Sequence, residues 1–363
     1  MSRFALSRAQ CEAWLLDCAL YSLDGLEAGT RWLGRMLVFA AFGIISLFTY
    51  TYFVDLLPLQ GILGGSLQWW LITVPGLWLL FNVLFNYVIC LIRDPGAPQK
   101  PSGGEGAAAP PPPRDESSGD SDDEEFLFRG GATAAPRWCR VCDAPKPPRT
   151  HHCSVCKKCR LRMDHHCPWI NQCVAYNNYG HFLRLLMYLV VGCAFVATVG
   201  MRPFLASMEV NASVPYVQGD LLVRLLSRRT RLQMTVVMAL ALGSALLALL
   251  LWNWWLAVTA TTGIEVYAAR SARKKLQLRG RIWVNQYDLG WRRNLEEVFG
   301  TPSWWRWMLP TLSFPPGDGH RFPTRSSPKR RGQVVQSVAG RSAPAPDAGT
   351  AAAEPRRRGV QVV

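Results

Sequence analysis

Residues 138–182 read WCRVCDAPKPPRTHHCSVCKKCRLRMDHHCPWINQCVAYNNYGHF and contain seven of the eleven cysteines of the chain. A structural zinc ion takes four ligands, usually thiolate or imidazole, so two zinc sites need eight. Two C-x2-C pairs so close together are a strong signal for zinc. Two histidines complete the set with six of the cysteines, which are Cys139, Cys142, Cys153, Cys156, Cys159 and Cys173. Cys167 is then left over.

The remaining cysteine ends the tetrapeptide Asp164-His165-His166-Cys167. One interpretation is that all seven cysteines bind metal. A metal module, however, has no need of an acidic residue three positions before a cysteine, whereas a thiol nucleophile benefits from a histidine base that a carboxylate orients. A neighbouring imidazolium lowers a thiol pKa from about 8.5 to well below 7.5. We therefore predict Cys167 as nucleophile, His165 as general base and Asp164 as the group that orients His165.

The spacing C-x2-C-x9-H-C-x2-C-x2-C-x4-D-H-H-C-x5-C-x4-N-x3-F is met from Cys139 to Phe182. It resembles the cysteine-rich domain of the DHHC protein S-acyltransferases, also called palmitoyltransferases. The resemblance implies that Cys167 is acylated from a long-chain acyl-CoA, such as palmitoyl-CoA. It also implies that the acyl group then passes to cysteine thiols of membrane-associated proteins.

The same resemblance divides the metal ligands between two structural zinc ions, because the two sites interleave along the chain. It assigns the first zinc to Cys139, Cys142, His152 and Cys159, and the second to Cys153, Cys156, His166 and Cys173. The adjacent residues His152 and Cys153 would then point to different metals and hold neighbouring hairpins together. In a domain with so small a core, each zinc contributes on the order of 10 kcal/mol to folding.

Four apolar runs predict a membrane protein. They cover residues 36–56, 67–92, 185–201 and 234–258 in a chain of 363 residues that is 49% hydrophobic. Runs of about 17–25 apolar residues suit a transmembrane helix, and clustered tryptophans mark membrane interfaces. Buried helices of a soluble protein are the alternative, but these runs leave no polar face for water. We expect an all-α integral membrane protein with four transmembrane helices and a zinc-stabilised cysteine-rich domain of short hairpins between helices 2 and 3.

Two crossings on either side of the cysteine-rich block put both termini and that block on one face of the membrane. Reduced, zinc-binding thiols belong in the cytosol, and basic loops favour the same face. No cleavable signal peptide is apparent. One feature disagrees with this topology, because five arginines between runs three and four would on charge alone place that loop in the cytosol. They are Arg202, Arg224, Arg228, Arg229 and Arg231. The acceptor pattern Asn211-Ala212-Ser213 in that loop is usable for glycosylation only if the loop is lumenal.

The chain organisation follows from these segments. We expect a cytosolic N-terminal segment (1–35), helices 1 and 2 (36–96), a disordered Pro-rich and acidic insertion (97–136), the zinc domain (137–182), helices 3 and 4 with a lumenal loop (183–260), a cytosolic C-terminal motif region (261–314) and a disordered basic tail (315–363). The insertion and the tail have too little apolar surface to offset the entropy of ordering. The tripeptide Asp94-Pro95-Gly96 is a helix stop.

Two C-terminal stretches also resemble the family. Tyr287 and Asn294 fill an aromatic and an asparagine position that stabilise the catalytic domain. Thr262 and Glu265 match a Thr-Thr-x-Glu motif whose second threonine is here Gly263. If that threonine normally touches the catalytic aspartate, the contact to Asp164 is either missing or replaced by Thr261.

The CoA phosphates require cations, and the resemblance points to Arg137, Lys146 and Arg149. Trp169, just after Cys167-Pro168, is expected at the mouth of the acyl cavity, and Trp304, Trp305 and Trp307 read as an interfacial anchor. We expect an ER or Golgi membrane, or the plasma membrane, and no nucleic-acid partner. The sequence leaves open whether an accessory subunit is needed. A membrane-anchored zinc scaffold without chemistry is the main alternative. Such a scaffold needs only the zinc ligands, so the presence of Asp164, His165 and Cys167 together argues against it. A transporter would need more ionisable residues within the four runs.

Overall fold

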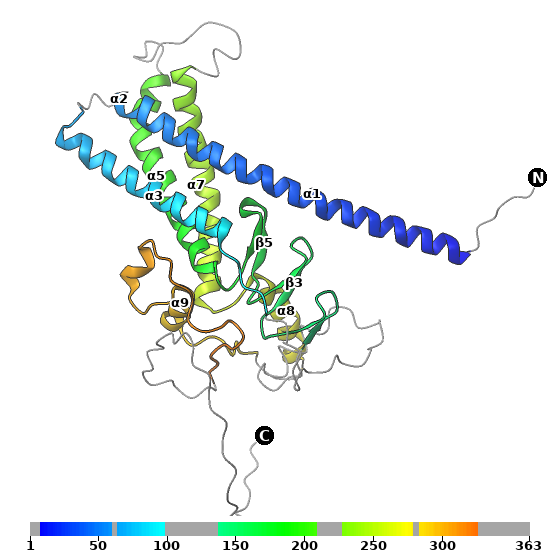
Figure 1. The fold of residues 1–363 in the computed structure, drawn as a ribbon. Coiled ribbons are helices and arrows are strands. Elements are labelled where there is room, and N and C mark those ends of the chain that lie inside the picture. The colour runs from blue at the N-terminus through cyan, green and yellow to red at the C-terminus, as the bar shows by residue number, and fades with distance from the viewer. Residues whose placement is uncertain (1–7, 60–63, 99–136, 209–226, 279–282, 326–363) are drawn as a thin grey trace, which may run out of the picture. The chain divides into compact units, whose positions relative to one another are not determined.

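The computed structural model describes residues 8–59, 64–98, 137–208, 227–278 and 283–325. All of them belong to one compact unit that ends at Ser326. Most of the predicted insertion, the tripeptide 211–213 and the basic tail beyond Arg325 lie outside the described residues. The elements discussed below keep the labels of Figure 1.

Four long helices dominate the described part of the chain (Figure 1). They are α1 (Arg8–Tyr50), α3 (Leu67–Ile92), α5 (Tyr179–Met208) and α7 (Arg228–Val258). The first continues through the π-helical segment η1 (Thr51–Leu56) into the short helix α2 (Leu57–Leu59). The four stretches that are long and apolar enough to cross a membrane are Gly29–Leu59, Leu67–Ile92, Tyr179–Met208 and Arg228–Val258. The predicted fold class, with four membrane helices, is confirmed.

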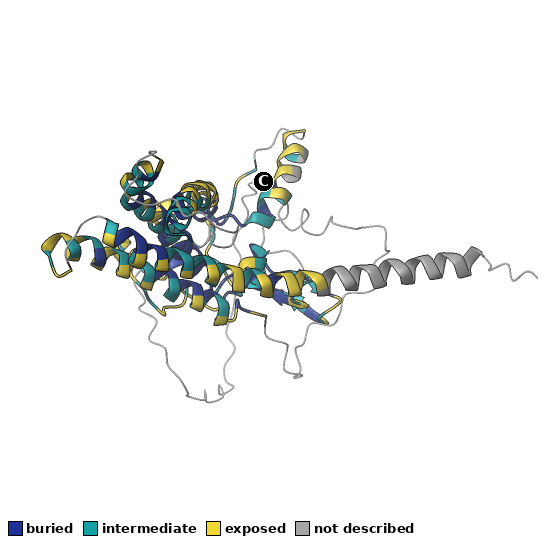
Figure 2. Ribbon diagram, turned by 90° about the horizontal axis from the view of Figure 1, so that it is seen from above, coloured by how far each residue is buried: buried dark blue, intermediate teal, exposed yellow. Residues whose placement is uncertain are grey.

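Two of the long helices, α3 and α7, begin after a serine cap, and the outward faces of the helices remain apolar. Ser66 accepts a hydrogen bond from the backbone N–H of Trp69, and Ser227 accepts one from Thr230, each over 3.2 Å. Serine at this position satisfies one of the free N–H groups of a helix start. Leu71, Phe81 and other large apolar side chains of α1, α3 and α7 are exposed. Figure 2 shows exposed residues along the outer faces of the long helices. A bilayer covers such surfaces, whereas water would not tolerate them.

Between α3 and α5 the cysteine-rich domain folds into three antiparallel hairpins that repeat every fourteen residues. The hairpins are β1 (Arg137–Cys139) with β2 (Ala144–Lys146), β3 (His151–Cys153) with β4 (Lys158–Arg160), and β5 (His165–Cys167) with β6 (Gln172–Val174). In each hairpin the first residue of the first strand pairs with the last residue of the second strand. The three hairpins therefore place equivalent residues in equivalent positions.

The first two hairpins carry a C-x2-C pair, and the third carries a modified one. In both complete pairs the backbone N–H of the second cysteine donates to the sulfur of the first, over 3.4 Å. Each turn then passes through a left-handed residue, at Asp143, Lys157 and Asn171 with φ of 48°, 53° and 49°. In the third hairpin the two cysteine positions hold Cys167 and Ile170. Cys167 thus stands where each of the earlier hairpins carries the first cysteine of its C-x2-C pair.

After α7 the chain returns across the end of the helix bundle that carries the cysteine-rich domain (Figure 1). We name this end the zinc side and the opposite end the far side. This C-terminal part contains α8 (Gly263–Gln277), α9 (Trp291–Phe299) and the turn η3 (Trp304–Met308). Trp304 and Trp305 are exposed, but Trp307 is buried and stacks on Phe299 at 5.4 Å between ring centroids. The predicted anchor therefore loses Trp307, whose indole is part of the core.

The described chain continues to Arg325 and so includes the first eleven residues of the predicted disordered tail, 315–325. Phe322 packs edge-on against Tyr176 and Tyr287, with ring centroids 5.8 and 6.2 Å apart. The backbone N–H of Arg325 donates to the carbonyl of Gln286 over 2.9 Å. Residues 315–325 therefore belong to the packed unit, because their aromatic and backbone groups find partners on the zinc domain and on the C-terminal motif.

Candidate active site and metal centres

The eight predicted metal ligands form two groups of four. In each group the four donor atoms lie within 4.8 Å of one another. The groups are Cys139, Cys142, His152 and Cys159, and Cys153, Cys156, His166 and Cys173. Both are Cys3His sets, a common composition of structural zinc sites.

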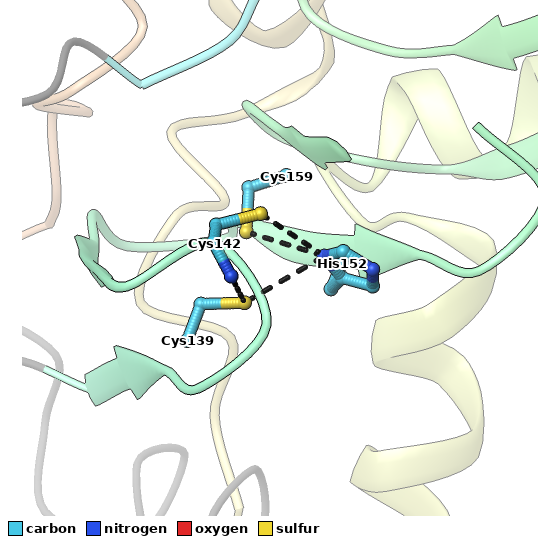
Figure 3. A group of neighbouring side chains, drawn as sticks. All are labelled: Cys139, Cys142, His152 and Cys159. Carbon is cyan, nitrogen blue, oxygen red and sulfur yellow. Dashed lines mark hydrogen bonds between the residues drawn. The ribbon is translucent and has the colours of Figure 1, made fainter. Parts of the chain in front are cut away.

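The distances within the groups test whether zinc fits. Tetrahedral zinc with bonds of about 2.3 Å to sulfur and about 2.0–2.1 Å to nitrogen separates these two atoms by roughly 3.5 Å. Around Nδ1 of His152 the three sulfurs lie at 3.3, 3.6 and 3.9 Å, and all four side chains converge (Figure 3). Around Nδ1 of His166 they lie at 3.4, 3.6 and 3.8 Å. Both groups therefore fit a tetrahedral zinc ion.

Strand β5 joins the second metal group to the predicted nucleophile. Alternate residues of a strand point to opposite faces. His166 faces the metal side, directly opposite its co-ligand Cys173 in the hairpin. His165 and Cys167 consequently share the other face. The metal ligand thereby fixes the backbone from which the predicted base and nucleophile project.

Asp164 is held in one orientation by three hydrogen bonds. Its carboxylate Oδ2 lies 2.7 Å from Nδ1 of His165, and its backbone N–H donates to the carbonyl of Val174 over 3.0 Å. The third bond comes from the backbone N–H of Gly263, which donates to Oδ1 over 2.7 Å. The side chain of Asp164 is only 5% exposed. Asp164 therefore holds the Nδ1 atom of His165 and keeps the imidazole in an orientation in which it interacts with Cys167.

The bond from Gly263 answers the question that the altered motif raised. Gly263 is the first residue of α8, and Thr262 caps that helix in a reciprocal capping box with Glu265. The N-terminal end of a helix stabilises a negative charge, so α8 is directed at the carboxylate of Asp164. Thr261 does not supply the missing contact, since it donates its hydroxyl to the carbonyl of Thr259 over 3.1 Å. The backbone N–H of Gly263 thus makes the contact to Asp164 that the second threonine of the motif was expected to make.

The environment of His165 favours its charged form. Burial lowers the pKa of His165. The hydrogen bond with Asp164 and the interaction with Cys167 together outweigh this effect and raise the pKa to about 9. The ring of Phe182 packs edge-on against the imidazole at 5.4 Å between centroids. An imidazolium next to a cysteine favours the thiolate, which is the nucleophilic form.

Arg149 lies in the core rather than on a cationic surface. Its guanidinium donates two hydrogen bonds of 2.7 Å to the carboxylate of Glu265 and one of 2.8 Å to the carbonyl of Ala260. It also lies 4.5 Å from the ring centre of Tyr287. Only 4% of Arg149 is exposed. A buried guanidinium whose fork is occupied cannot reach a phosphate without breaking this pair, so its geometry does not support the expected CoA contact.

Arg137 and Lys146 have a different setting. They face each other across the open end of the first hairpin, as its outermost register partners. Both side chains are half-buried. Arg137 donates to the carbonyl of Thr150 over 3.1 Å. The first hairpin thus brings two cations together at one edge of the domain.

Asn294 connects the end of α7 to the C-terminal motif. Its amide nitrogen donates to the carbonyl of Val258 and to the carboxylate of Asp288, each over 2.7 Å. Its amide oxygen accepts a hydrogen bond of 2.9 Å from the backbone N–H of Leu289. The residue is buried. These bonds fix the segment that carries Tyr287 beneath Arg149.

An apolar cavity of about 110 Å³ opens between α1, η1, α3, α5 and α7. Its lining includes Tyr52, Gly76, Val83, Cys193 and Phe195. Val83 belongs to the same core cluster as Tyr87 and Cys167. Seven residues of helix, from Val83 to Cys90, span about 10 Å. The cavity thus extends away from the Cys167 end of the bundle toward the far side.

Trp169 is not among the described residues that line this cavity. Its side chain is 48% exposed. Its carbonyl accepts a hydrogen bond of 2.9 Å from the hydroxyl of Tyr87, the residue one turn beyond Val83 on α3. The side chain of Gln172 donates to the carbonyl of Cys90 on the same helix. The third hairpin is thereby fastened to α3 at two points shortly after Cys167.

Asp94 has a positioning role that the sequence did not indicate. Beyond ending α3, its carboxylate accepts from the backbone N–H of Gly96 over 2.7 Å and pairs with Arg160 at 3.2 Å. The carbonyls of Pro95 and Gly96 accept from Asn177 and Leu161 over 3.1 Å each. The tripeptide is therefore a docking point for the zinc domain. Only the proximity of two segments far apart in the sequence reveals it.

A second network links α3 and α5 to the C-terminal segment. Arg184 of α5 is buried, donates to the carbonyl of Trp307 over 2.8 Å, and lies 4.9 Å from the ring centre of Phe299. Arg93 donates to the carbonyls of Leu312 and Ser313 over 2.6 and 3.0 Å. These arginines hold an irregular backbone against the helices on the zinc side. The sequence contained no spacing signal for this contact.

The sequence of this chain matches those of known proteins. The family model for DHHC palmitoyltransferase matches residues 132–270. The Arabidopsis thaliana protein named probable protein S-acyltransferase 15 is 32% identical over 255 residues, which cover 67% of this chain and 87% of that protein. The chain therefore belongs to the DHHC palmitoyltransferase family.

Two animal relatives extend the comparison. Human palmitoyltransferase ZDHHC15 is 33% identical over 199 residues, or 53% of this chain and 52% of that protein. Palmitoyltransferase ZDHHC16A of Danio rerio is 26% identical over 338 residues, or 81% of this chain and 79% of that protein. The matched region thus spans about half the length of ZDHHC15 and most of the length of the fish and plant relatives.

Proposed function

We propose that this chain is a protein S-palmitoyltransferase that first acylates itself on Cys167 and then transfers the acyl group to a cysteine of a membrane-associated protein. The observation that carries the proposal is the arrangement around β5. Cys167 shares a face with His165, His165 is hydrogen-bonded to Asp164, and Asp164 is held by the N-terminal end of α8. A zinc scaffold would have no use for this arrangement.

In the first half-reaction the thiolate of Cys167 attacks the carbonyl carbon of the acyl-CoA thioester. A new bond forms between Sγ and the acyl carbon, the bond to the CoA sulfur breaks, and His165 returns the proton to the CoA thiolate. In the second half-reaction His165 takes the proton of a substrate thiol, which attacks the acyl-enzyme and regenerates Cys167. Each step exchanges one thioester for another, so no ATP is consumed.

The acyl chain would occupy the apolar cavity between the helices. A palmitoyl chain has about fourteen methylenes, and burial contributes about 0.8 kcal/mol for each. The cavity lining is aliphatic and aromatic, and it begins one helix turn from Tyr87. The CoA moiety would remain outside the bundle, with its phosphates near Arg137 and Lys146 and with Trp169 at the mouth of the cavity.

Both termini and the zinc domain would face the cytosol, where thiols remain reduced and acyl-CoA is available. The far side of the bundle would then face the lumen of the ER or Golgi, or the outside at the plasma membrane. Zinc is structural in this scheme: it orders the hairpins and takes no part in the chemistry. The partners are long-chain acyl-CoA, membrane-associated proteins with cytosolic cysteines and the bilayer.

Self-acylation tests the proposal directly. The detergent-solubilised full chain and its Cys167→Ser variant are incubated with labelled palmitoyl-CoA after their zinc content has been matched. We expect a hydroxylamine-sensitive label on the native protein and none on the variant. A folded, zinc-loaded native protein that takes no label, even with membrane extract added as a source of partner subunits, would contradict the proposal.

A further inference from the structure

The first membrane helix changes its geometry near its far end. Residues Thr51–Leu56 form the π-helical segment η1. π-helical turns are rare in proteins and occur mostly where a side chain must be directed to a functional position. This segment contains Asp55, which is the only acidic residue in the described membrane span Gly29–Leu59.

Asp55 is buried and fully engaged by arginines of the fourth membrane helix. Its side chain is 1% exposed. Arg231 donates to both carboxylate oxygens, each over 3.0 Å, and Arg228 lies at 3.4 Å. Bidentate pairs of this kind fix both distance and orientation. A carboxylate within a membrane protein bundle persists only when it is paired.

A second set of contacts fastens the same segment. The hydroxyl of Thr235 donates to that of Thr51 over 3.2 Å inside the core. Tyr52, Leu56 and Leu57 form one apolar cluster with residues of α7, namely Leu232 and Val236. The π-helical segment is thus attached to the beginning of α7 at several points.

The anchored segment presents Tyr52 to the apolar cavity. The hydroxyl of Tyr52 donates to the carbonyl of Ile72 over 3.0 Å, and its ring lies 5.7 Å from that of Phe195. A Cβ atom at Gly76 would meet the Tyr52 hydroxyl at 3.1 Å, so α3 approaches the ring closely. Tyr52, Gly76 and Phe195 all line the cavity. Together they form its wall on the far side.

We propose that the Asp55–Arg231 ion pair is a positioning device that keeps η1 π-helical and thereby places Tyr52 as the end wall that limits acyl chain length. The inference rests on the proposed function, since it concerns the same cavity. Without the pair, η1 relaxes toward an ordinary α-helix, which has fewer residues per turn and rotates Tyr52 away from Gly76. The cavity then admits longer chains.

The test measures acyl preference rather than total activity. The full chain is incubated with equal amounts of palmitoyl-CoA and stearoyl-CoA, and the two acyl groups on Cys167 are quantified by mass spectrometry. Asp55→Asn, Arg231→Gln and Tyr52→Leu are compared with the native protein. In all three we expect the stearoyl-to-palmitoyl ratio to rise by about three- to fourfold per additional methylene buried. A purely structural role would lower both labels together and leave the ratio unchanged.

Arg229→Gln provides the matched control. It removes a positive charge from the same helix start, and within the described residues Arg229 makes none of the contacts with Asp55. Its ratio should remain native, and an equal rise there would overturn the inference. Should Asp55→Asn fail to fold, Asp55→Glu and Arg231→Lys decide, since each keeps the charge but changes the geometry. A native ratio in both would overturn the inference. Absence of label on the zinc-loaded native protein would instead overturn the proposed function.

Discussion

The backbone N–H of Gly263 donates a hydrogen bond of 2.7 Å to Oδ1 of Asp164. This contact connects the first residue of α8 to the predicted catalytic group across 99 residues of sequence. It compensates for the absent threonine side chain in this motif. The carboxylate keeps its orientation because a helix N-terminus supplies both a donor and a favourable field.

Gly263→Pro should abolish this bond without removing the helix. Proline is favourable at the first position of a helix but has no N–H to donate. Loss of a hydrogen bond to a charged group is worth about 1.5–3 kcal/mol, so we expect self-acylation to fall by roughly 10- to 100-fold. Gly263→Ala is the control, because its Cβ would meet Asp164 at ordinary contact distances of 3.5 Å and more. Initial rates at matched zinc content are the measurement, and equal rates in the two variants would contradict the assignment.

Arg149→Met should destabilise the protein strongly. It leaves the buried carboxylate of Glu265 without its partner, which costs about 3–5 kcal/mol. The double variant Arg149→Met with Glu265→Gln should recover part of the loss, since no buried charge is left alone. Thermal unfolding in detergent measures both. If Arg149→Met melted like the native protein and only weakened acyl-CoA binding, the residue would be a phosphate ligand after all.

The pair also determines a dependence on pH. Burial raises the pKa of Glu265, but the Arg149 guanidinium outweighs it and holds that pKa below its usual range. A depressed pKa contributes stability that is present above the unfolded pKa of about 4.3 and is lost as pH falls through the folded pKa. The difference in melting temperature between native protein and Glu265→Gln should therefore be the same at about pH 8 and about pH 5.5. A difference that fades between these two values would mean that the pKa is not depressed.

Lys146→Ala should weaken acyl-CoA binding with little effect on folding. Lys146 is half-buried at the open edge of the first hairpin, opposite Arg137. Loss of one charge-assisted contact predicts a KM for acyl-CoA that is higher by roughly 3- to 30-fold, with unchanged maximal self-acylation and melting temperature. Lys158→Ala is the control, because it removes the same charge from the turn end of the second hairpin, where Lys158 pairs with Cys153. An unchanged KM in Lys146→Ala would remove this residue from the CoA site.

The two metal centres should differ in their effect on activity. Cys142→Ser and Cys156→Ser alter equivalent positions of the first and second hairpins, and each should reduce the bound zinc from about two ions to about one per chain. Cys156 belongs to the group of His166, whose neighbours in β5 are His165 and Cys167. Cys156→Ser should therefore suppress self-acylation more than Cys142→Ser does. Zinc content and label are measured on the same samples, and the reverse order would contradict the proposed coupling through β5.

The metal groups and the four membrane helices could be predicted because their signals are local. The C-x2-C pairs and the Asp164–Cys167 tetrapeptide encode their chemistry in short spacings, and long apolar runs are unambiguous. The fourteen-residue repeat escaped detection because strands of three residues have almost no period of their own. The burial of Arg149 could not be predicted for a related reason: a cationic side chain in a basic stretch has the same appearance whether it faces solvent or a buried carboxylate far along the chain.

The sequence by itself determined which atoms are available: eight metal ligands, one remaining cysteine, a neighbouring histidine and aspartate, and enough apolar length for four membrane crossings. Only the tertiary structure decided how they are oriented. It replaced the missing threonine by the N–H of Gly263, paired Arg149 with Glu265, moved Trp307 into the core and joined Asp55 to Arg231. Each of these contacts joins residues whose separation in sequence carries no spacing signal. They form because burial makes every unpaired polar group costly, so distant partners must meet.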